Sequence, residues 1–366
     1  MARREEVEGK LAKVRAFLQE QELDAVVLTT TANFAWLTAG GDNHVVMCSE
    51  TGVAPLVVTA EGQHMLTNNI EAQRFQDEEL DDLPFEVHFM QWDEEDSAAM
   101  LGSVAPGRVG TDGGWPPHAV DVADAFARLR WQLMEPEIER YREVGMIASH
   151  ALAGTGREIE PGQTEHEIAA LLAGRVLAAG ATPVVVLIAV DERIDRYRHP
   201  IPTEARLKRR AMLVLGAVRW GLGISATRMV HFGGLPTELR ERHQACCYVD
   251  ACFNLETRPG ASVADIFSRA VKAYEESGYG EEWRLHHQGG ATGYAPREYK
   301  GGFDCDEVVL EDQAFAWNPS ITGTKSEDTI LARAEGTEFL SPAAGWPTLE
   351  VSYGETRLQR PDILVR

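Results

Sequence analysis

The apolar positions of the chain follow two patterns, one typical of helices and one typical of buried strands. Residues 4–21 carry apolar side chains at the spacing of one helical face. The members of that face are Val7, Leu11, Val14 and Leu18. Short apolar runs then predict buried strands at residues 24–29, 54–59 and 86–89. Residues 105–117, rich in glycine and proline, predict loops. A helix followed by strands indicates an α/β layer.

A new helical pattern begins near residue 135, and we place a domain boundary there. The chain has 366 residues, which exceeds the usual size of a single core and favours two domains. We therefore predict an N-terminal domain of residues 1–135 and a C-terminal domain of residues 136–366. The connection between them is too short to be a flexible linker.

The second domain contains an internal repeat. Residues 161–168 and residues 259–266 both place a Pro-Gly turn before a helix, 98 positions apart. The pairs Thr164/Glu167 and Ser262/Asp265 have the spacing of a helix cap, and a glycine, Gly180 or Gly278, ends each predicted helix. The predicted strands after the two copies are residues 183–190, 212–218, 308–310 and 314–317. The equal helix lengths favour a duplicated αβ half.

Charge and terminal sequence narrow the classes of partner. The formal net charge of -22 repels both nucleic-acid backbones and anionic membrane surfaces, so we expect neither as a partner. The first residues are charged and lack the apolar stretch of a secretory signal, and no segment is long and apolar enough to span a membrane. These features predict a cytoplasmic protein.

The cysteines do not form a recognisable site. Their number is odd, and their spacing lacks a C-x-x-C pair, which argues against a disulfide framework and against a zinc site. They are Cys48, Cys246, Cys247, Cys252 and Cys305. We interpret them as buried free thiols.

Several separated segments match known motifs. Residues 31–40 (TANFAWLTAG) are similar to N-x-x-Y-L-T-G. Motifs similar to V-D-L-G-A, S-D-x-T-R, H-x-x-G-H-G-x-G, F-x-x-E-P-G and E-D-T follow in order at residues 213–217, 225–228, 286–293, 315–320 and 326–329. Together these segments resemble the creatinase/aminopeptidase P family (peptidase family M24), whose N-terminal domain carries the first motif, and the resemblance covers nearly the whole chain. It implies a mixed α/β (α+β) protein with a creatinase-type N-terminal domain and a pseudo-twofold pita-bread C-terminal domain, and it implies a homodimer.

The resemblance also implies where metal ligands would lie. Family peptidases bind two divalent metals with two aspartates, one histidine and two glutamates, and here those positions hold Val214, Ser225, Gly290, Asn318 and Glu327. The eleven-residue step from Val214 to Ser225 equals the family's spacing between the aspartates. Valine and glycine offer no ligand atom, and the serine and asparagine oxygens are neutral. Two dications about 3.5–4 Å apart need several anionic ligands. We therefore expect no metal and no other cofactor.

Other polar residues of the family's active site have counterparts. His199 matches the histidine that acts as acid/base in creatinase, a role suited to a side chain that titrates near neutrality. His286 matches a histidine that contacts substrate in relatives, whereas the adjacent His287 has no family role and is interpreted as structural. Arg297 replaces a further substrate-side histidine by a permanent cation, which favours an anionic substrate group such as a carboxylate.

The remaining candidates are two carboxylates and three residues near the former metal positions. Glu327 and Glu298 could bind a cationic group of the substrate, although Glu327 could instead pair with Arg297 or Lys325. The predicted substrate-binding set also includes Ser225, Asn318 and Arg228. The family's equivalent of Arg228 usually forms a structural salt bridge, and that alternative stays open.

The sequence thus favours a metal-independent, creatinase-like hydrolase of a C–N bond in a small molecule, with His199 as general acid/base and with Glu327 and Glu298 in the site. One alternative is a non-catalytic relative that binds a ligand or a protein. Another is a metallopeptidase of the Xaa-Pro aminopeptidase type.

Overall fold

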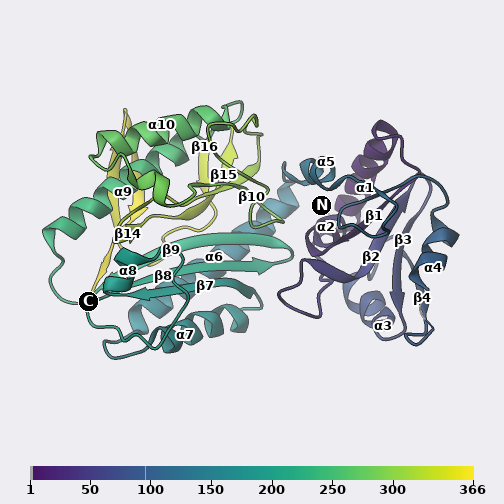
Figure 1. The fold of residues 1–366 in the computed structure, drawn as a ribbon, viewed down its shortest axis with the longest axis horizontal. Helices are drawn as coiled ribbons and strands as arrows, with labels where there is room; N and C mark the ends of the chain where they lie inside the picture. The colour runs from purple at the N-terminus through teal and green to yellow at the C-terminus, as the bar shows by residue number, and fades with distance from the viewer. Residues whose placement is uncertain (1–2, 95) are drawn as a thin grey trace. The chain divides into compact units, whose positions relative to one another are not determined.

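The computed structural model describes residues 3–94 and 96–366. It divides into two compact units, Met1–Glu137 and Ile138–Arg366 (Figure 1). The predicted boundary near residue 135 lies at the first residue of α6 (Glu135–Glu158), the helix in which the division falls.

The first unit is built on a mixed six-stranded sheet in the order β4-β3-β2-β1-β5-β6. Its strands are β1 (Ala25–Thr30), β2 (Thr51–Thr59), β3 (Gln63–Asn68), β4 (Glu86–Met90), β5 (Val109–Thr111) and β6 (Val120–Asp121). Its helices are α1 (Arg3–Glu20), α2 (Thr31–Leu37), α3 (Ala72–Arg74), α4 (Ser97–Val104) and α5 (Ala123–Ala127), with short helical turns at Phe75–Glu79 and Arg128–Arg130. The predicted helix and three predicted strands are confirmed as α1, β1, β2 and β4, and the predicted apolar face of α1 is buried.

The segment that resembles the family's N-terminal motif has a structural role. Asn33, at the start of α2, is buried and donates to Asp112 at 2.7 Å. The same carboxylate accepts hydrogen bonds from the backbone and side chain of Thr29 and of Thr30. These contacts join the end of β1 to the segment after β5, because a buried carboxylate needs several donors.

The second unit contains two larger sheets, β19-β9-β8-β7 and β11-β10-β12-β15-β16. The strands of the first sheet are β7 (Thr182–Val190), β8 (Arg210–Arg219), β9 (Leu222–His231) and β19 (Leu364–Val365). Those of the second are β10 (Gly289–Thr292), β11 (Tyr299–Lys300), β12 (Gln313–Trp317), β15 (Asp328–Arg333) and β16 (Gly336–Phe339). Two small hairpins are formed by β13 (Ser320–Ile321) with β14 (Thr324–Lys325) and by β17 (Thr348–Tyr353) with β18 (Thr356–Pro361).

Helices cover both sheets of this unit. They are α7 (Glu165–Ala178), α8 (Glu192–Arg196), α9 (Thr237–Glu256) and α10 (Val263–Glu276), with a 3-10 turn at Glu282–Leu285. Figure 1 shows α7 against the first sheet and α9 with α10 against the second. The core under α9 and α10 is aromatic, and Phe253 stacks on Trp317 with ring centroids 4.5 Å apart.

The predicted duplication is present in the backbone. Helices α7 and α10 have 14 residues each, and the Thr164 and Ser262 side chains accept from the N–H of Glu167 and of Asp265, respectively. The Pro-Gly turns are held in the same way, since Gly162 N–H donates to Leu207 O at 2.7 Å and Gly260 N–H donates to Val309 O at 2.8 Å. Gly180 and Gly278 both have positive φ and end their helices.

Three details of the predicted structure are wrong. Residues 105–117 are not loop throughout, because Val109–Thr111 form β5, which pairs with β1. Residues 308–310 form no strand, because Val308 makes only an isolated bridge with Ser262 and is exposed. The cysteines are free, but only Cys246, Cys247 and Cys252 are buried, whereas Cys48 is exposed. None of the described helices is both long enough and apolar enough to traverse a lipid bilayer.

Candidate functional site

Three histidines from two distant segments meet in the second unit. His199 lies in the loop after α8, and His286 and His287 lie just before β10. His199 Nε2 is 2.8 Å from His286 Nε2, although the two residues are 87 positions apart. The His286 and His287 rings stack with centroids 4.4 Å apart. His199 and His287 are exposed, while His286 is half-buried.

The three rings are neutral near pH 7. Burial is the first cause of the lowered pKa in each case, and the pKa falls to about 3 for His286 and to about 4 for His287. The Lys325 ammonium lowers all three pKa values further, and Glu327 opposes this effect at His199 and His286. The contact between His199 and His286 therefore joins the N–H of one neutral ring to the lone pair of the other.

This cluster makes stability depend on pH. Below the ordinary pKa of 6.5, and above the lowered values in the folded state, unfolded histidines bind protons that the folded ones do not. The free energy of unfolding therefore falls as the pH falls from about 6.5 towards 4. We expect the free energy of unfolding, measured with urea, to fall less steeply over this pH range in His286→Gln than in the parent chain.

The control for this prediction is His166→Gln, because the His166 side chain is exposed and lies outside the cluster. It is expected to leave the pH slope unchanged. A parent-like slope in His286→Gln would mean that the cluster does not titrate in this way.

A buried ion pair lies beside the histidines. Lys325, the last residue of β14, places Nζ 2.7 Å from Glu327 Oε2, and both side chains are almost fully buried. The same oxygen accepts a hydrogen bond from Thr227 Oγ1 at 2.6 Å. Burial alone would raise the pKa of Glu327, but Lys325, Thr227 and Arg297 together hold it below its ordinary value. Glu327 is thus a carboxylate neutralised by a lysine.

Arg297 and Glu298 lie between β10 and β11 and have different roles. Arg297 Nη1 donates to Pro296 O at 2.8 Å, while its buried Nε has no protein partner. Burial lowers the pKa of Arg297, and Glu327 opposes that shift through its negative charge. Glu298 Oε1 accepts from the N–H of Ala295 at 3.1 Å and so closes the local turn.

Several buried polar atoms of this region have no hydrogen-bond partner among the residues that the structure describes. They are His286 Nδ1, Arg297 Nε, Asn318 Oδ1 and Ser320 Oγ. Buried polar atoms are normally hydrogen-bonded, so unpartnered ones mark positions for water or a ligand. The region is therefore equipped to bind a polar molecule.

The cavity beside the histidines is small. Next to His286 and Lys325 it has a volume of about 10 Å³, which is room for one water molecule. The exposed side, where His199 and His287 lie, is open to a substrate. A larger cavity of about 180 Å³ lies in the first unit, but none of the described residues that line it is titratable, so we assign acid–base chemistry to the histidine region.

Comparison with known proteins places the chain in a family. The model of metallopeptidase family M24 matches residues 139–335, more than half of the chain, and the creatinase/prolidase N-terminal domain matches residues 10–144. The chain belongs to metallopeptidase family M24. The described fold is therefore the pita-bread fold of this family, preceded by its creatinase-type N-terminal domain.

Named relatives are peptidases. A Xaa-Pro dipeptidase of Pyrococcus furiosus is 24% identical over 229 residues, covering 60% of this chain and 66% of that protein. An uncharacterized peptidase of Staphylococcus aureus is 23% identical and covers 91% of this chain and 98% of its own. The solved prolidase of Pyrococcus horikoshii has a TM-score of 0.79 at 20% identity, over 91% of this chain and 98% of that one. The chain thus spans about two thirds of the length of the first curated relatives it matches.

The M24 metal positions of this chain do not fit a dinuclear metal site. Val214 packs in an apolar cluster with Met212 and Met229. Gly290 has φ +152°, and a Cβ there would lie 2.3 Å from Tyr299 O, so the backbone leaves no room for a ligand side chain. Ser225 and Asn318 offer neutral oxygens.

The last potential M24 ligand, Glu327, is already neutralised by Lys325. The ring nitrogens of His199, His286 and His287 lie within 4.8 Å of one another and form a different potential metal site. The Lys325 ammonium that lowers their pKa values would also repel a dication there.

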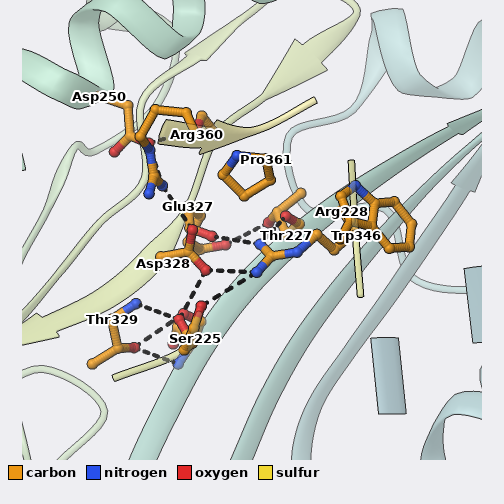
Figure 2. A network of polar contacts seen from close by, with 12 residues as sticks. Ser225, Thr227, Arg228, Asp250, Glu327, Asp328, Thr329, Trp346, Arg360 and Pro361 are labelled. Carbon is orange, nitrogen blue, oxygen red and sulfur yellow. Dashed lines mark hydrogen bonds and ion pairs between the residues drawn. The ribbon is translucent and has the colours of Figure 1, made fainter. Parts of the chain in front are cut away.

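Arg228 belongs to an internal ion-pair network rather than to a substrate surface. Its Nη2 donates to Asp328 Oδ1 at 2.9 Å, and Asp328 Oδ2 accepts from Arg360 at 2.7 Å. Figure 2 shows this network beside the Glu327–Thr227 contact and the reciprocal hydrogen bonds of Ser225 with Thr329. Because Arg228 is buried and its guanidinium is held by Asp328, we assign it the structural role left open above and not the predicted substrate-binding one.

The structure adds two members to the region. The ring of His287, a residue without a family counterpart, stacks on His286, and this contact is compatible with the structural role predicted for it. Thr227 was not singled out, although it donates to Glu327. The position of His287 next to His286 in the sequence was the available signal for His287. The contact of Thr227 with Glu327 arises from an isolated β-bridge between these two residues, which no local sequence pattern reveals.

Proposed function

We propose that this M24 protein is a metal-independent hydrolase of a C–N bond in a small molecule. The observation that carries the proposal is the buried ion pair between Lys325 and Glu327. The only carboxylate left among the family's ligand positions is bound by a fixed cation, and a dication would have to displace that cation. The Lys325 ammonium lies where the family's chemistry uses metal and can take over part of the metal's electrostatic role.

The His199–His286 pair supports proton transfer without metal. Because the two Nε2 atoms share one proton, the outward nitrogens of the pair carry one lone pair and one N–H. In the proposed reaction, a water molecule attacks the carbon of the scissile C–N bond and gives its proton to His199. The leaving nitrogen then takes a proton from the pair as the C–N bond breaks. Burial and the Lys325 ammonium lower the pKa of His286, so a protonated pair is a stronger acid than an ordinary imidazolium; this favours release of the proton and disfavours its uptake from water.

Cationic and neutral donors can hold the substrate's anionic groups. Lys325 and Arg297 both act electrostatically on Glu327 and place two positive charges in this region. Donors fixed in a partly desolvated site stabilise developing negative charge in a transition state. We assign Arg297 to a substrate carboxylate, and Asn318, whose buried Oδ1 is unpartnered, to a substrate N–H.

The names of the relatives favour a second candidate, a metal-dependent Xaa-Pro peptidase. Two relatives from Pyrococcus species are Xaa-Pro dipeptidases, at 24% and 25% identity to this chain. If this chain shares their substrate, Xaa-Pro dipeptides are the first compounds to test. The two candidates differ in whether the reaction needs a metal.

Chelation distinguishes the two candidates. We expect the chain, after dialysis against excess chelator, to hydrolyse a member of a panel of Xaa-Pro dipeptides, N-methylated amino acids and amidines. Its rate should be unchanged when Mn²⁺ is restored, because no step of the proposed reaction uses metal. Product formation measured by mass spectrometry checks this.

Turnover that is lost on chelation and restored by Mn²⁺ would establish the metallopeptidase instead. Thermal stabilisation by a panel compound without product would indicate a non-catalytic binding protein, because a ligand that binds only the folded state raises the melting temperature.

A further inference from the structure

A second cluster of metal-ligating side chains lies in the first unit, apart from the family's active site. His64 of β3 and Glu86 and His88 of β4 place one nitrogen or oxygen each within 4.8 Å of the others. His64 Nδ1 is 3.0 Å from His88 Nε2. Glu86 Oε2 is 3.5 Å from the first of these atoms and 3.7 Å from the second.

The spacing of these three atoms fits a bound transition metal. In the plane of the three ligand atoms, one point is equally far from all of them. It lies about 2.0 Å from each, which is the length of Zn–N and Zn–O bonds in proteins. Gly62 supports the arrangement. A Cβ at Gly62 would lie 2.5 Å from His64 Nε2, so the glycine lets this ring edge pack against the backbone while Nδ1 faces His88.

Strand register brings the three side chains to one face of the sheet. β3 and β4 are parallel, with His64 opposite Glu86 and Leu66 opposite His88, and alternate residues of a strand share a face. Further along the same face, Leu66 and Met90 pack in the apolar cluster that includes Met100 of α4. Two histidines and a glutamate therefore lie on the same face of the sheet as this apolar cluster. Packing against the cluster does not explain these polar side chains.

Electrostatics at this cluster favour a cation more than at the C-terminal histidines. The Glu86 carboxylate lies 3.5 Å from His64 Nδ1 and 3.7 Å from His88 Nε2, so it adds a negative charge to the two nitrogen ligands. At the C-terminal histidines, by contrast, the nearby Lys325 ammonium opposes a cation. The Glu86 side chain is 69% exposed, which leaves a path for entry and an open side for water.

We propose that His64, Glu86 and His88 bind one divalent transition-metal ion, with Zn²⁺ as the chemical class that suits two imidazoles and a carboxylate. The ion would join β4, the edge strand of the six-stranded sheet, to its neighbour β3. The site is independent of the proposed hydrolase chemistry. The bound ion would stabilise the pairing of the edge strand β4, whose residues are only partly buried, with β3.

Titration of the full chain with Co²⁺ tests the site, because Co²⁺ bound by nitrogen and oxygen ligands gives a visible absorption spectrum. We expect one equivalent to bind to the parent chain and to His199→Gln/His286→Gln, and none to bind to His64→Gln/His88→Gln. Zn²⁺ should displace the Co²⁺ and raise the melting temperature of the first two proteins only.

A single substitution, Glu86→Gln, guards against failure of the double variant to fold, because the Glu86 side chain is largely exposed. Loss of an outer-shell partner of a metal ligand costs about 10–100-fold in metal affinity, so loss of this ligand should weaken Co²⁺ binding at least tenfold. Co²⁺ binding that persists in His64→Gln/His88→Gln, parent affinity in Glu86→Gln, or no binding by the parent would each overturn the proposal.

The outcome is separable from that of the chelation experiment. Metal that is lost from His64→Gln/His88→Gln belongs to this cluster and leaves the proposed hydrolase intact. Mn²⁺-dependent turnover in the same variant would contradict the proposed hydrolase and leave this site untouched.

Discussion

His199→Ala is expected to lower turnover of the chain's substrate by about 10²–10⁴-fold, which is the usual contribution of a general acid/base. The alanine variant removes the ring that shares a proton with His286, so neither the attacking water nor the leaving nitrogen has its proton partner. The loss should lie in kcat rather than in KM, because His199 acts on protons and is not assigned to hold the substrate. Steady-state kinetics on the compound identified in the panel measure it.

The matched control is His166→Ala, since His166 is another exposed histidine of the same unit and lies outside the cluster. It should keep the parent kcat. Because His199 is exposed, circular dichroism and the melting temperature of His199→Ala should match those of the parent. Parent turnover in His199→Ala would refute its assigned role.

Arg360→Met is expected to reduce the free energy of unfolding by about 3–5 kcal/mol, the cost of removing one partner from a buried ion pair. Arg360 is 1% exposed and lies 2.6 Å from Asp250 Oδ2 and 2.7 Å from Asp328 Oδ2 (Figure 2). Burial raises the pKa of Asp250, and Arg360 is the main group that opposes this shift. Without the guanidinium, Asp250 must be buried as an unpaired charge or take up a proton. Urea unfolding measures the loss.

The same strand supplies the control for this substitution. Arg357 of β18 pairs with Glu350 at 3.1 Å, but the side chains are 72% and 50% exposed. Arg357→Met should therefore change the free energy of unfolding by no more than about 0.5 kcal/mol. Adding Asp250→Asn to Arg360→Met should recover part of the loss, because it removes the unpaired charge. Equal effects of the two arginine substitutions would show that burial does not govern the network.

The Arg360 network also explains why Arg228 could not be assigned from sequence. Arg228 stands beside the family's second metal-ligand position, which suggested contact with substrate as one possibility. In the fold, its partner Asp328 is 100 residues away, and that carboxylate is shared with Arg360. An arginine with this partner is a structural element of the core, and only the pairing of β9 with the segment before β15 brings the two together.

The ion-pair partner of Glu327 also could not be assigned from the sequence. The sequence left two partners open for it, Arg297 and Lys325. The hydrogen bond from Lys325 settles the direct partner at 2.7 Å, while Arg297 acts on Glu327 only through its charge. The choice depends on the direction of side chains along β14 and the segment after it, which the spacing of two residues does not determine.

The sequence by itself determined the properties that depend on local chemistry. Helix caps, glycine-ended helices and apolar periodicity predicted α1, α7 and α10 and the repeat between the last two, because these signals act over a few residues. The poor fit of two metals to the five expected positions stays a prediction of the resemblance, and it depends on local chemistry too, since a valine or a glycine has no side-chain ligand atom in any fold.

Only the tertiary structure decided which polar groups meet. Loop closure and strand register bring together segments that are apart in the chain. They pair His199 with His286 and His64 with His88, and they place Thr227 against the Glu327 carboxylate that Lys325 also contacts. A shift of one residue in register would turn His88 to the other face of the sheet. Packing of whole elements fixes that register, so no motif of the sequence revealed His64 and His88 as neighbours. The family resemblance placed His199, His286 and Glu327 in one site, but it did not give their contacts.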